Sequence, residues 1–241
     1  MTRGFVDLHC HFVPGIDDGA RSIEEAVGIL AGLASLGFEL VIGTPHMRPG
    51  LFDNTRSDLE HAYARLEPEL EGRALPRTAL SSEHYFDDVV YARLTAGTAL
   101  PYPGGRAALL EFYEIDFPPM IDRCFADLRR RGILPVIAHP ERYRCLWKSL
   151  DALERLVESG AAALLDTAAL EGKYGRTPRR TAEAILERGL YQAACSDAHR
   201  PGDVADVARG IERIRHLYGD EEVELLFVEG PRALLEGHLP E

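Results

Sequence analysis

The chain has 241 residues, of which 46% are hydrophobic and 27% are charged, so it has enough apolar material for a sizeable core. α/β barrels reach this length as one unit, and residues 1–241 are therefore expected to form a single domain. The formal net charge of −12 argues against a sequence-independent grip on nucleic acid or on an anionic membrane, because both would be repelled. No stretch resembles a signal peptide or is apolar enough to span a bilayer. We expect a cytoplasmic protein without membrane insertion.

Short runs rich in Val, Ile and Leu alternate with longer stretches of helical periodicity. This alternation is typical of repeated β-α units around a parallel sheet. The predicted strands cover residues 5–8, 40–43, 78–81, 108–111, 134–138, 162–165 and 191–195. The predicted fold is therefore an α/β barrel, and the loops after its strands should converge on one face.

The first predicted helix shows the clearest boundaries. Ser22 is a capping residue, Glu25 stands at the capping-box position, and Gly37 ends the helix. One face of this helix carries the apolar residues Ala26, Ile29, Leu30 and Leu33. Further helices are predicted near 55–70, 118–131, 150–159, 178–188 and 204–218, and the turn-rich segment 94–106 is predicted to be a loop inside the domain.

Histidines and carboxylates follow nearly every predicted strand. They are His9, His11, His46, Glu83, Glu111, His139, Asp197 and His199, with Asp18 in the turn after the first strand. Taken alone, the pair His9 and His11, Asp18 and His46 read more simply as surface, turn or loop residues, whereas an acid that faces inward at Glu83 or Glu111 would be costly unless it is paired or binds a cation. The repetition of such residues at strand ends favours a shared metal site. Five histidines and four carboxylates exceed what one ion can use, which implies two or three ions. Such ions can hold a bridging hydroxide that attacks a phosphoester, so phosphoester hydrolysis is the expected chemistry.

Five motifs resemble the polymerase-and-histidinol-phosphatase (PHP) superfamily. They are the segments DLHCH at 7–11, PGIDDG at 14–19, TPH at 44–46, AHPERY at 138–143 and SDAH at 196–199. Within that superfamily the chain is most similar to the CpsB-type bacterial tyrosine phosphatases, which are linked to capsule and exopolysaccharide synthesis. The resemblance implies a distorted (β/α)7 barrel of the PHP type that hydrolyses phosphotyrosine on a protein, with a bacterial tyrosine kinase as the expected substrate. Manganese is the expected metal, and iron and zinc are the alternatives.

The resemblance also implies a role for each residue of the motifs. One ion would bind His9, His11, Glu83 and Asp197, a second would share Glu83 and add Glu111 and His139, and a third would bind Asp18, His46 and His199. Arg48 and Arg142 match positions near the phosphate, where a guanidinium can hold two oxygens. The loop after His199 is shorter than in the family, and Arg200 is the candidate to replace an arginine missing from it. Asp166 is an acid at a position where the family more often has an amide or hydroxyl. We expect it to support the residues around the metals and not to bind a metal itself.

Three alternatives remain open from the residues. The first is hydrolysis of a small phosphomonoester such as histidinol phosphate, which the same ligands would serve. The second is a non-catalytic metal-binding scaffold. Cys124 and Arg130 match the Cys-x5-Arg spacing of cysteine-dependent phosphatases, but both lie inside a predicted helix without a glycine-rich cradle. We therefore interpret that match as chance.

Overall fold

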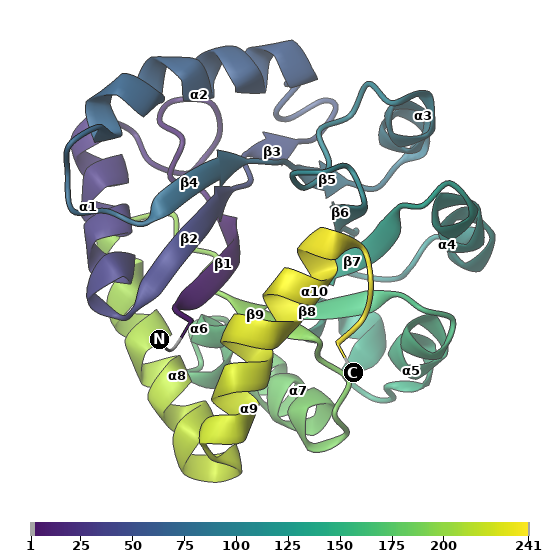
Figure 1. Ribbon diagram of the computed structural model, residues 1–241. Helices are drawn as coiled ribbons and strands as arrows, with labels where there is room; N and C mark the ends of the chain where they lie inside the picture. The colour runs from purple at the N-terminus through teal and green to yellow at the C-terminus, as the bar shows by residue number, and fades with distance from the viewer. Residues whose placement is uncertain (1–2, 241) are drawn as a thin grey trace.

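The computed structural model describes residues 3–240 and contains a ring of parallel strands surrounded by helices (Figure 1). The strands are β1 (Phe5–Cys10), β2 (Phe38–Gly43), β3 (His46–Met47), β4 (Arg77–Leu80), β5 (Glu83–Tyr85), β6 (Ala107–Glu111), β7 (Leu134–Ala138), β8 (Ala162–Asp166) and β9 (Ala193–Cys195). The helices are α1 (Ile23–Ser35), α2 (Arg56–Leu70), α3 (Asp88–Ala96), α4 (Ile121–Arg130), α5 (Asp151–Glu158), α6 (Thr167–Leu170), α7 (Arg176–Glu187), α8 (Val204–Tyr218), α9 (Asp220–Glu224) and α10 (Gly230–Glu236). Short helical turns cover Pro140–Arg142 (η1), Arg144–Leu146 (η2), Pro201–Asp203 (η3) and Leu225–Glu229 (η4).

The strands occupy seven positions around the barrel, as the sequence predicts. Two positions hold an interrupted strand: the chain breaks between β2 and β3 at Thr44-Pro45, and between β4 and β5 at Ser81-Ser82. The hydrogen-bonded order is β1-β2-β4 in one sheet and β3-β5-β6-β7-β8-β9 in the other, with every pair parallel. The predicted α/β barrel is therefore confirmed, and the two interruptions distort it.

The first and last strands meet only near their carboxyl ends. The amide of Asp197 donates to the carbonyl of His9 over 2.9 Å, and the amide of His11 donates to the carbonyl of Ala198 over 3.0 Å. Cys10 and Ala198 form an isolated parallel bridge. These contacts close the ring of strands at the end where the predicted metal ligands lie.

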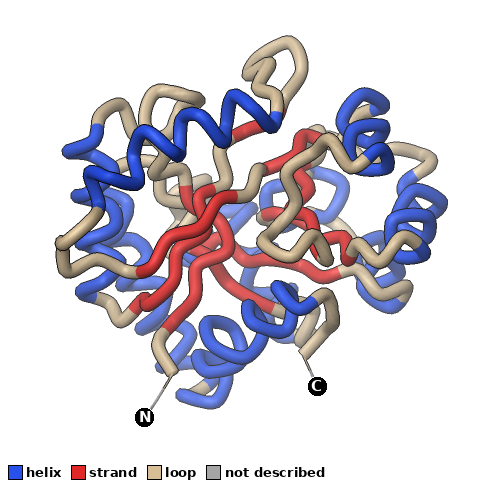
Figure 2. Tube along the Cα trace, turned by 45° about the horizontal axis from the view of Figure 1, so that its top comes forward, coloured by secondary structure: helices blue, strands red, loops and turns tan. Residues whose placement is uncertain are grey.

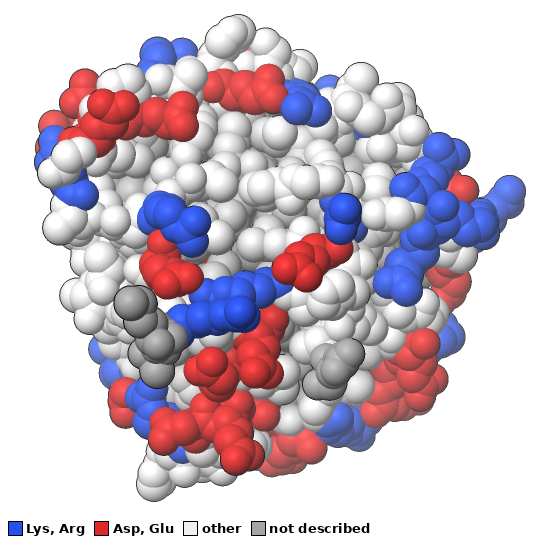
Figure 3. All heavy atoms as spheres, in the orientation of Figure 1, with Lys and Arg blue, Asp and Glu red and all other residues white. Residues whose placement is uncertain are grey.

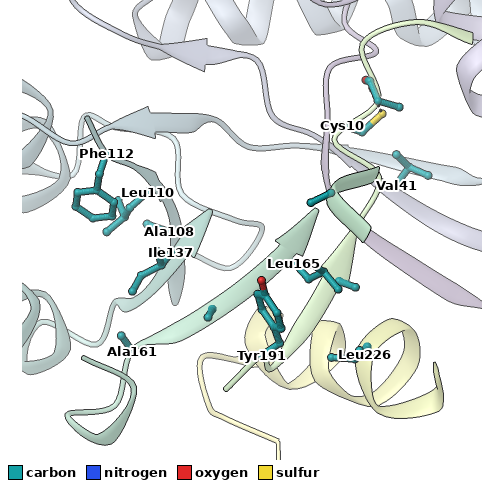
Figure 4. Close-up of a cluster of buried hydrophobic side chains, with 14 of the residues drawn as sticks. Cys10, Val41, Ala108, Leu110, Phe112, Ile137, Ala161, Leu165, Tyr191 and Leu226 are labelled. Carbon is teal, nitrogen blue, oxygen red and sulfur yellow. Dashed lines mark hydrogen bonds between the residues drawn. The ribbon is translucent and has the colours of Figure 1, made fainter. Parts of the chain in front are cut away.

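Side chains alternate between the barrel interior and the helices, because successive residues of a strand point to opposite faces. On β6, Ala107 and Leu109 belong to the interior cluster, whereas Ala108 and Leu110 pack toward the helices. Figure 4 shows part of this outer layer, in which Leu110, Phe112 and Ile137 lie together. The interior series of β6 continues to Glu111, so the alternation that fills the barrel also aims a carboxylate along its axis.

Helix α1 begins and ends as predicted. The side chain of Ser22 accepts from the amide of Glu25, and Ala26, Ile29, Leu30 and Leu33 are the buried face. The Glu25 carboxylate accepts from the backbone amide of Arg21, which differs from the reciprocal bond to Ser22 that a capping box implies. The guanidinium of Arg21 holds the same carboxylate and explains this shift.

The amino-terminal end of the barrel is closed by α10, which crosses the strands in the front of Figure 1. Arg232 of α10 donates to the carbonyl of Gly4 and to the carboxylate of Glu39, at the starts of β1 and β2. Gly230 approaches the start of β9 so closely that a Cβ there would lie 1.8 Å from the carbonyl oxygen of Gln192. The last helix is thus fitted to this end of the barrel, opposite the predicted ligands.

Charges of both signs share the closed end. On the face shown in Figure 3, acidic side chains gather over α9 and basic ones over α4. The acidic side chains on this face therefore do not form one continuous negative patch. Among residues 3–240, none of the helices has the length and apolar character that crossing a membrane requires.

Candidate metal centre

The predicted ligands come together at the carboxyl ends of the strands, around a cavity of about 190 Å³. His9 and His11 extend from β1, His46 lies on β3, Glu83 on β5 and Glu111 on β6. His139 follows β7, and Asp197 and His199 follow β9. Asp18, His46, Glu83, Glu111, His139, Asp197 and His199 line the cavity itself, and His9 and His11 are fully buried. All nine predicted ligands thus lie in one cluster.

Four side chains converge at the base of this cluster. The Nε2 atoms of His9 and His11 are 3.1 Å apart. His9 Nε2 lies 3.2 Å from Glu83 Oε2 and 3.3 Å from Asp197 Oδ1, and the corresponding distances from His11 Nε2 are 3.4 and 3.5 Å. Two imidazole nitrogens and two carboxylate oxygens at this spacing could hold one divalent ion.

Glu83 joins this group to a second one. Its Oε1 lies 2.9 Å from His139 Nε2, and its Oε2 lies 3.1 Å from His46 Nδ1. His46 Nδ1 is also 3.8 Å from Glu111 Oε2. His46 Nδ1 and Glu111 Oε2 are both buried and have no hydrogen-bond partner. Because buried polar atoms normally have a partner, this pair fits a cation bound between them.

The third group lies nearest to solvent. Asp18 Oδ1 is 3.5 Å from His46 Nε2 and 3.6 Å from His199 Nε2, and the Asp18 side chain is 56% exposed. The imidazoles of His11 and His199 stack with ring centroids 4.1 Å apart, so His11 borders this group as well. His46 therefore offers one nitrogen to each of two groups.

The electrostatics of the cluster also suit a cation. Burial raises the pKa of Glu111, and the neighbouring Glu83 carboxylate raises it further, to about 7. Burial lowers the pKa of His139 to about 4, with a contribution from the positive charge of Arg142. Burial also raises the pKa of Glu83, but the imidazoles of His9 and His46 outweigh it and hold that pKa well below its usual range. A divalent ion would relieve the repulsion between the two glutamates and would bind the neutral imidazole.

Asp17 fixes the orientation of a histidine, a role that the sequence analysis missed. Its Oδ2 lies 2.8 Å from His11 Nδ1 and accepts from the backbone amide of His46 over 3.0 Å, and its Oδ1 accepts from the amide of Gly19. With Nδ1 of His11 held in this way, Nε2 is the nitrogen left to face the cluster. The pair Asp17-Asp18 in the turn that follows His11 was the available signal, but the sequence prediction assigned a ligand role only to Asp18.

The three candidate arginines occupy different places. Arg48 lines the cavity, and its guanidinium lies 4.1 Å from the ring centre of Tyr85. Arg142 also lines the cavity and donates to Asp197 and, over 2.9 Å, to Asp166. The predicted position of Asp166 behind the ligands agrees with this contact.

Arg200 lies apart from the other two arginines. It donates to the backbone carbonyls of Asp18, Gly19 and His199 and is not among the residues that line the cavity. Its guanidinium holds the turn that carries Asp18, which favours a role in positioning that turn over direct contact with phosphate.

The formal Cys-x5-Arg match does not form a site. Cys124 and Arg130 both lie in α4, where Cys124 is half-buried and Arg130 pairs with Asp127. Burial raises the pKa of the Cys124 thiol, which opposes formation of a nucleophilic thiolate. This agrees with the interpretation of the match as chance.

The fold and the cluster define a class of protein: a β/α barrel with histidines and carboxylates gathered at the carboxyl ends of its strands. A family model described as "Capsular polysaccharide synthesis, CpsB/CapC" matches residues 5–236. The chain belongs to this family, and the resemblance seen in its motifs is confirmed at that level.

Individual relatives agree with this assignment. The chain is 29% identical to tyrosine-protein phosphatase YwqE of Bacillus subtilis (strain 168), over 80% of this chain and 77% of the relative. It is 25% identical to the putative tyrosine-protein phosphatase CapC of Staphylococcus aureus, over 97% and 90% of the two chains. A solved structure from work on YwqE of Bacillus subtilis and CpsB of Streptococcus pneumoniae, described as unique metal-dependent tyrosine phosphatases, superimposes with a TM-score of 0.88. That match has 26% identity and covers 98% of this chain and 96% of the other.

Proposed function

We propose that this protein is a metal-dependent protein-tyrosine phosphatase that acts in capsule or exopolysaccharide synthesis. The observation that carries the proposal is the convergence of all nine predicted ligands, with Arg48 and Arg142, on one cavity. The similarity to metal-dependent tyrosine phosphatases over nearly the whole chain supports the same activity. The proposed substrate is a phosphotyrosine-bearing protein in the cytoplasm, in the first instance a bacterial tyrosine kinase.

The ligands are proposed to form three overlapping sets within a single domain. His9, His11, Glu83 and Asp197 would hold one ion, Glu83 with Glu111 and His139 a second, and Asp18 with His46 and His199 a third. His46 would stand between the last two sets, because its Nδ1 lies 3.1 Å from Glu83 and 3.8 Å from Glu111. The mixed nitrogen and oxygen donors suit manganese, iron or zinc, and manganese is our first choice. Such ions, when bound, supply an activated water and neutralise the charge of the phosphoryl oxygens.

The protein side chains then bind and orient the substrate. Arg48 can hold phosphoryl oxygens because its guanidinium lines the cavity and forms no ion pair with a carboxylate in the described part of the chain. Arg142 adds positive charge but is held in place by Asp166 and Asp197. The leaving group is a phenol of pKa about 10, so it needs less help from a proton donor than an alcohol would. No side chain is required as a nucleophile, and we expect no phosphoenzyme.

The decisive experiment is a phosphatase assay with a metal screen on three substrates: a phosphotyrosyl peptide, a phosphoseryl peptide and histidinol phosphate. The proposal predicts turnover of the phosphotyrosyl peptide and dephosphorylation of an autophosphorylated bacterial tyrosine kinase. Preference for histidinol phosphate would instead identify a small-molecule phosphatase. Metal binding without turnover of any ester would identify a scaffold, and a trapped covalent phosphoprotein would refute the mechanism.

A further inference from the structure

A second cavity, of about 210 Å³, lies next to the metal cavity and shares Arg48 and Glu111 with it. Its other walls include Tyr85, Tyr113, Ile115 and Arg144. Three further cavities in the described chain, which are lined by outer helices and by the segment 146–150, share no residue with the metal cavity. The second cavity is therefore the natural extension of the site for the part of a substrate that lies beyond its phosphoryl group.

The walls of this second cavity carry large apolar side chains that are open to solvent. Tyr113 is 60% exposed and Ile115 is 52% exposed, although most large apolar side chains of the described chain are buried. Both lie in the segment after β6, next to the ligand Glu111. Exposed apolar groups at the edge of a polar site commonly mark the place where an apolar part of a ligand binds.

Arg48 stands at the junction of the two cavities. Its guanidinium lies over the ring of Tyr85 at 4.1 Å, which restricts its position between the aromatic wall and the ligands. A phosphoryl group in the metal cavity and a ring attached to it in the second cavity would both contact this arginine. Along the site, the predicted metal ligands come first, then the guanidinium of Arg48, and then the aromatic and aliphatic walls of the second cavity. An aryl phosphate fits this order, because its phosphoryl group would face the ligands and its ring would face the apolar walls.

We infer that the second cavity binds the aromatic ring of the substrate, so that Tyr85, Tyr113 and Ile115 give the site its preference for aryl over alkyl phosphate esters. This inference rests on the proposed phosphatase function but specifies which residues determine specificity. Tyr113 and Ile115 contact the ring from the solvent side, and Tyr85 both contacts the ring and holds Arg48. None of the three is a predicted metal ligand.

The test uses the double variant Tyr113→Ser/Ile115→Ser, because both side chains are exposed and their loss should not disturb folding. The control is Val89→Ser/Leu217→Ser, which removes apolar groups of similar exposure on α3 and α8. Binding of phenylphosphonate and of propylphosphonate is measured by calorimetry on the metal-loaded protein. We expect the double variant to bind phenylphosphonate about tenfold more weakly, because the loss of apolar contacts in a pocket typically changes affinity by about this factor. It should bind propylphosphonate as tightly as the unaltered protein does.

Turnover separates the remaining possibilities. If the ring occupies the second cavity, kcat/KM for phenyl phosphate and for a phosphotyrosyl peptide should fall by the same factor in the double variant, mainly through KM. A fall for the peptide alone would overturn the inference, because the cavity would then bind a neighbouring residue of the peptide. Equal affinity for phenylphosphonate in all three proteins would also overturn it. If the unaltered protein fails to hydrolyse any phosphotyrosyl substrate, the proposed function fails, whereas the phosphonate binding still decides where the ring lies.

Discussion

Two predicted ligands leave their strands in a backbone conformation that non-glycine residues rarely adopt. Among residues 3–240, His139 (φ 33°) and Asp197 (φ 43°) are the non-glycine residues with positive φ. Such a conformation costs about 1–3 kcal/mol and persists only where the surroundings enforce it. Here the backbone amides of His139 and Asp197 are held by the carbonyls of Leu164 and His9. In this conformation both side chains line the cavity. The local sequence does not predict the positive φ of either residue.

At Asp197, one substitution can remove the negative charge of the side chain and keep the backbone conformation. Asparagine tolerates a left-handed conformation and keeps the size of the side chain, so Asp197→Asn should fold. It removes the negative charge beside His9 and His11, and we expect kcat/KM to fall at least about 100-fold, with less metal retained after dialysis. Elemental analysis and a phosphatase assay check this. Asp122→Asn, on the surface, is the control, and full activity with full metal content in Asp197→Asn would contradict the ligand assignment.

A second prediction concerns Asp17. Asp17→Asn weakens the contact that orients His11, and the loss of such a supporting carboxylate typically costs about 10–100-fold in metal affinity or activity. Metal affinity is measured by competition with a chromophoric chelator. Asp151→Asn, an exposed residue of α5, is the matched control. An affinity equal to that of the control would mean that the contact between Asp17 and His11 is incidental.

At the scale of elements, the strands were predictable and the interruptions were not. Each strand is a short apolar run, which periodicity identifies, but the breaks at Thr44-Pro45 and Ser81-Ser82 depend on how neighbouring strands bend around the ligands. The carboxyl-terminal helices were missed for a different reason. Gly230-Pro231 reads as a helix breaker, yet the wider turn Leu225–Glu229 and a proline in the first turn of α10 let the chain continue.

Helix α10 should contribute to stability through its buried side chains, such as Leu234, and through Arg232. Its guanidinium donates to Val228, Gly4 and Glu39, and hydrogen bonds that involve a charged group contribute about 1.5–3 kcal/mol each in favourable cases. We expect Arg232→Ala to lower the free energy of unfolding by about 1–3 kcal/mol, which corresponds to roughly 2–4 °C in Tm per kcal/mol. Thermal unfolding measures the effect, and Arg176→Ala is the exposed control. Because α10 lies at the opposite end from the cavity, kcat/KM should be unchanged, and a loss of activity without loss of stability would contradict this view.

At the scale of the whole molecule, the closure of the barrel and the assembly of the site depend on the same residues. The bonds that join β1 to the segment after β9 involve His9, His11 and Asp197, all predicted ligands of one ion. Sequence alone predicted that these residues would lie together, because each lies at or just after the end of an apolar strand, and parallel strands bring their ends together. It could not identify Asp17 or the second cavity, because those depend on side-chain contacts between distant loops.

Removal of metal should therefore loosen the fold as well as stop turnover. A ligand present at 100 times its Kd stabilises the folded state by about 2.7 kcal/mol, so a strong chelator should lower Tm by roughly 5–10 °C. Both Tm and activity should return when manganese is added after the chelator is dialysed away. Differential scanning fluorimetry at fixed protein concentration measures the shift. An unchanged Tm with lost activity would mean that the ions do not brace the junction of β1 and β9.

The position of the chain ends has a practical consequence. Residues 3 and 240 both lie at the end of the barrel that α10 closes, away from the ligands (Figures 1 and 2). A tag, a fluorescent protein or a surface anchor fused at either end would therefore project away from the cavity. If the protein is immobilised through such a fusion, the metal cavity stays accessible to large phosphoproteins. This arrangement suits pull-down of substrates with a variant that lacks a metal ligand.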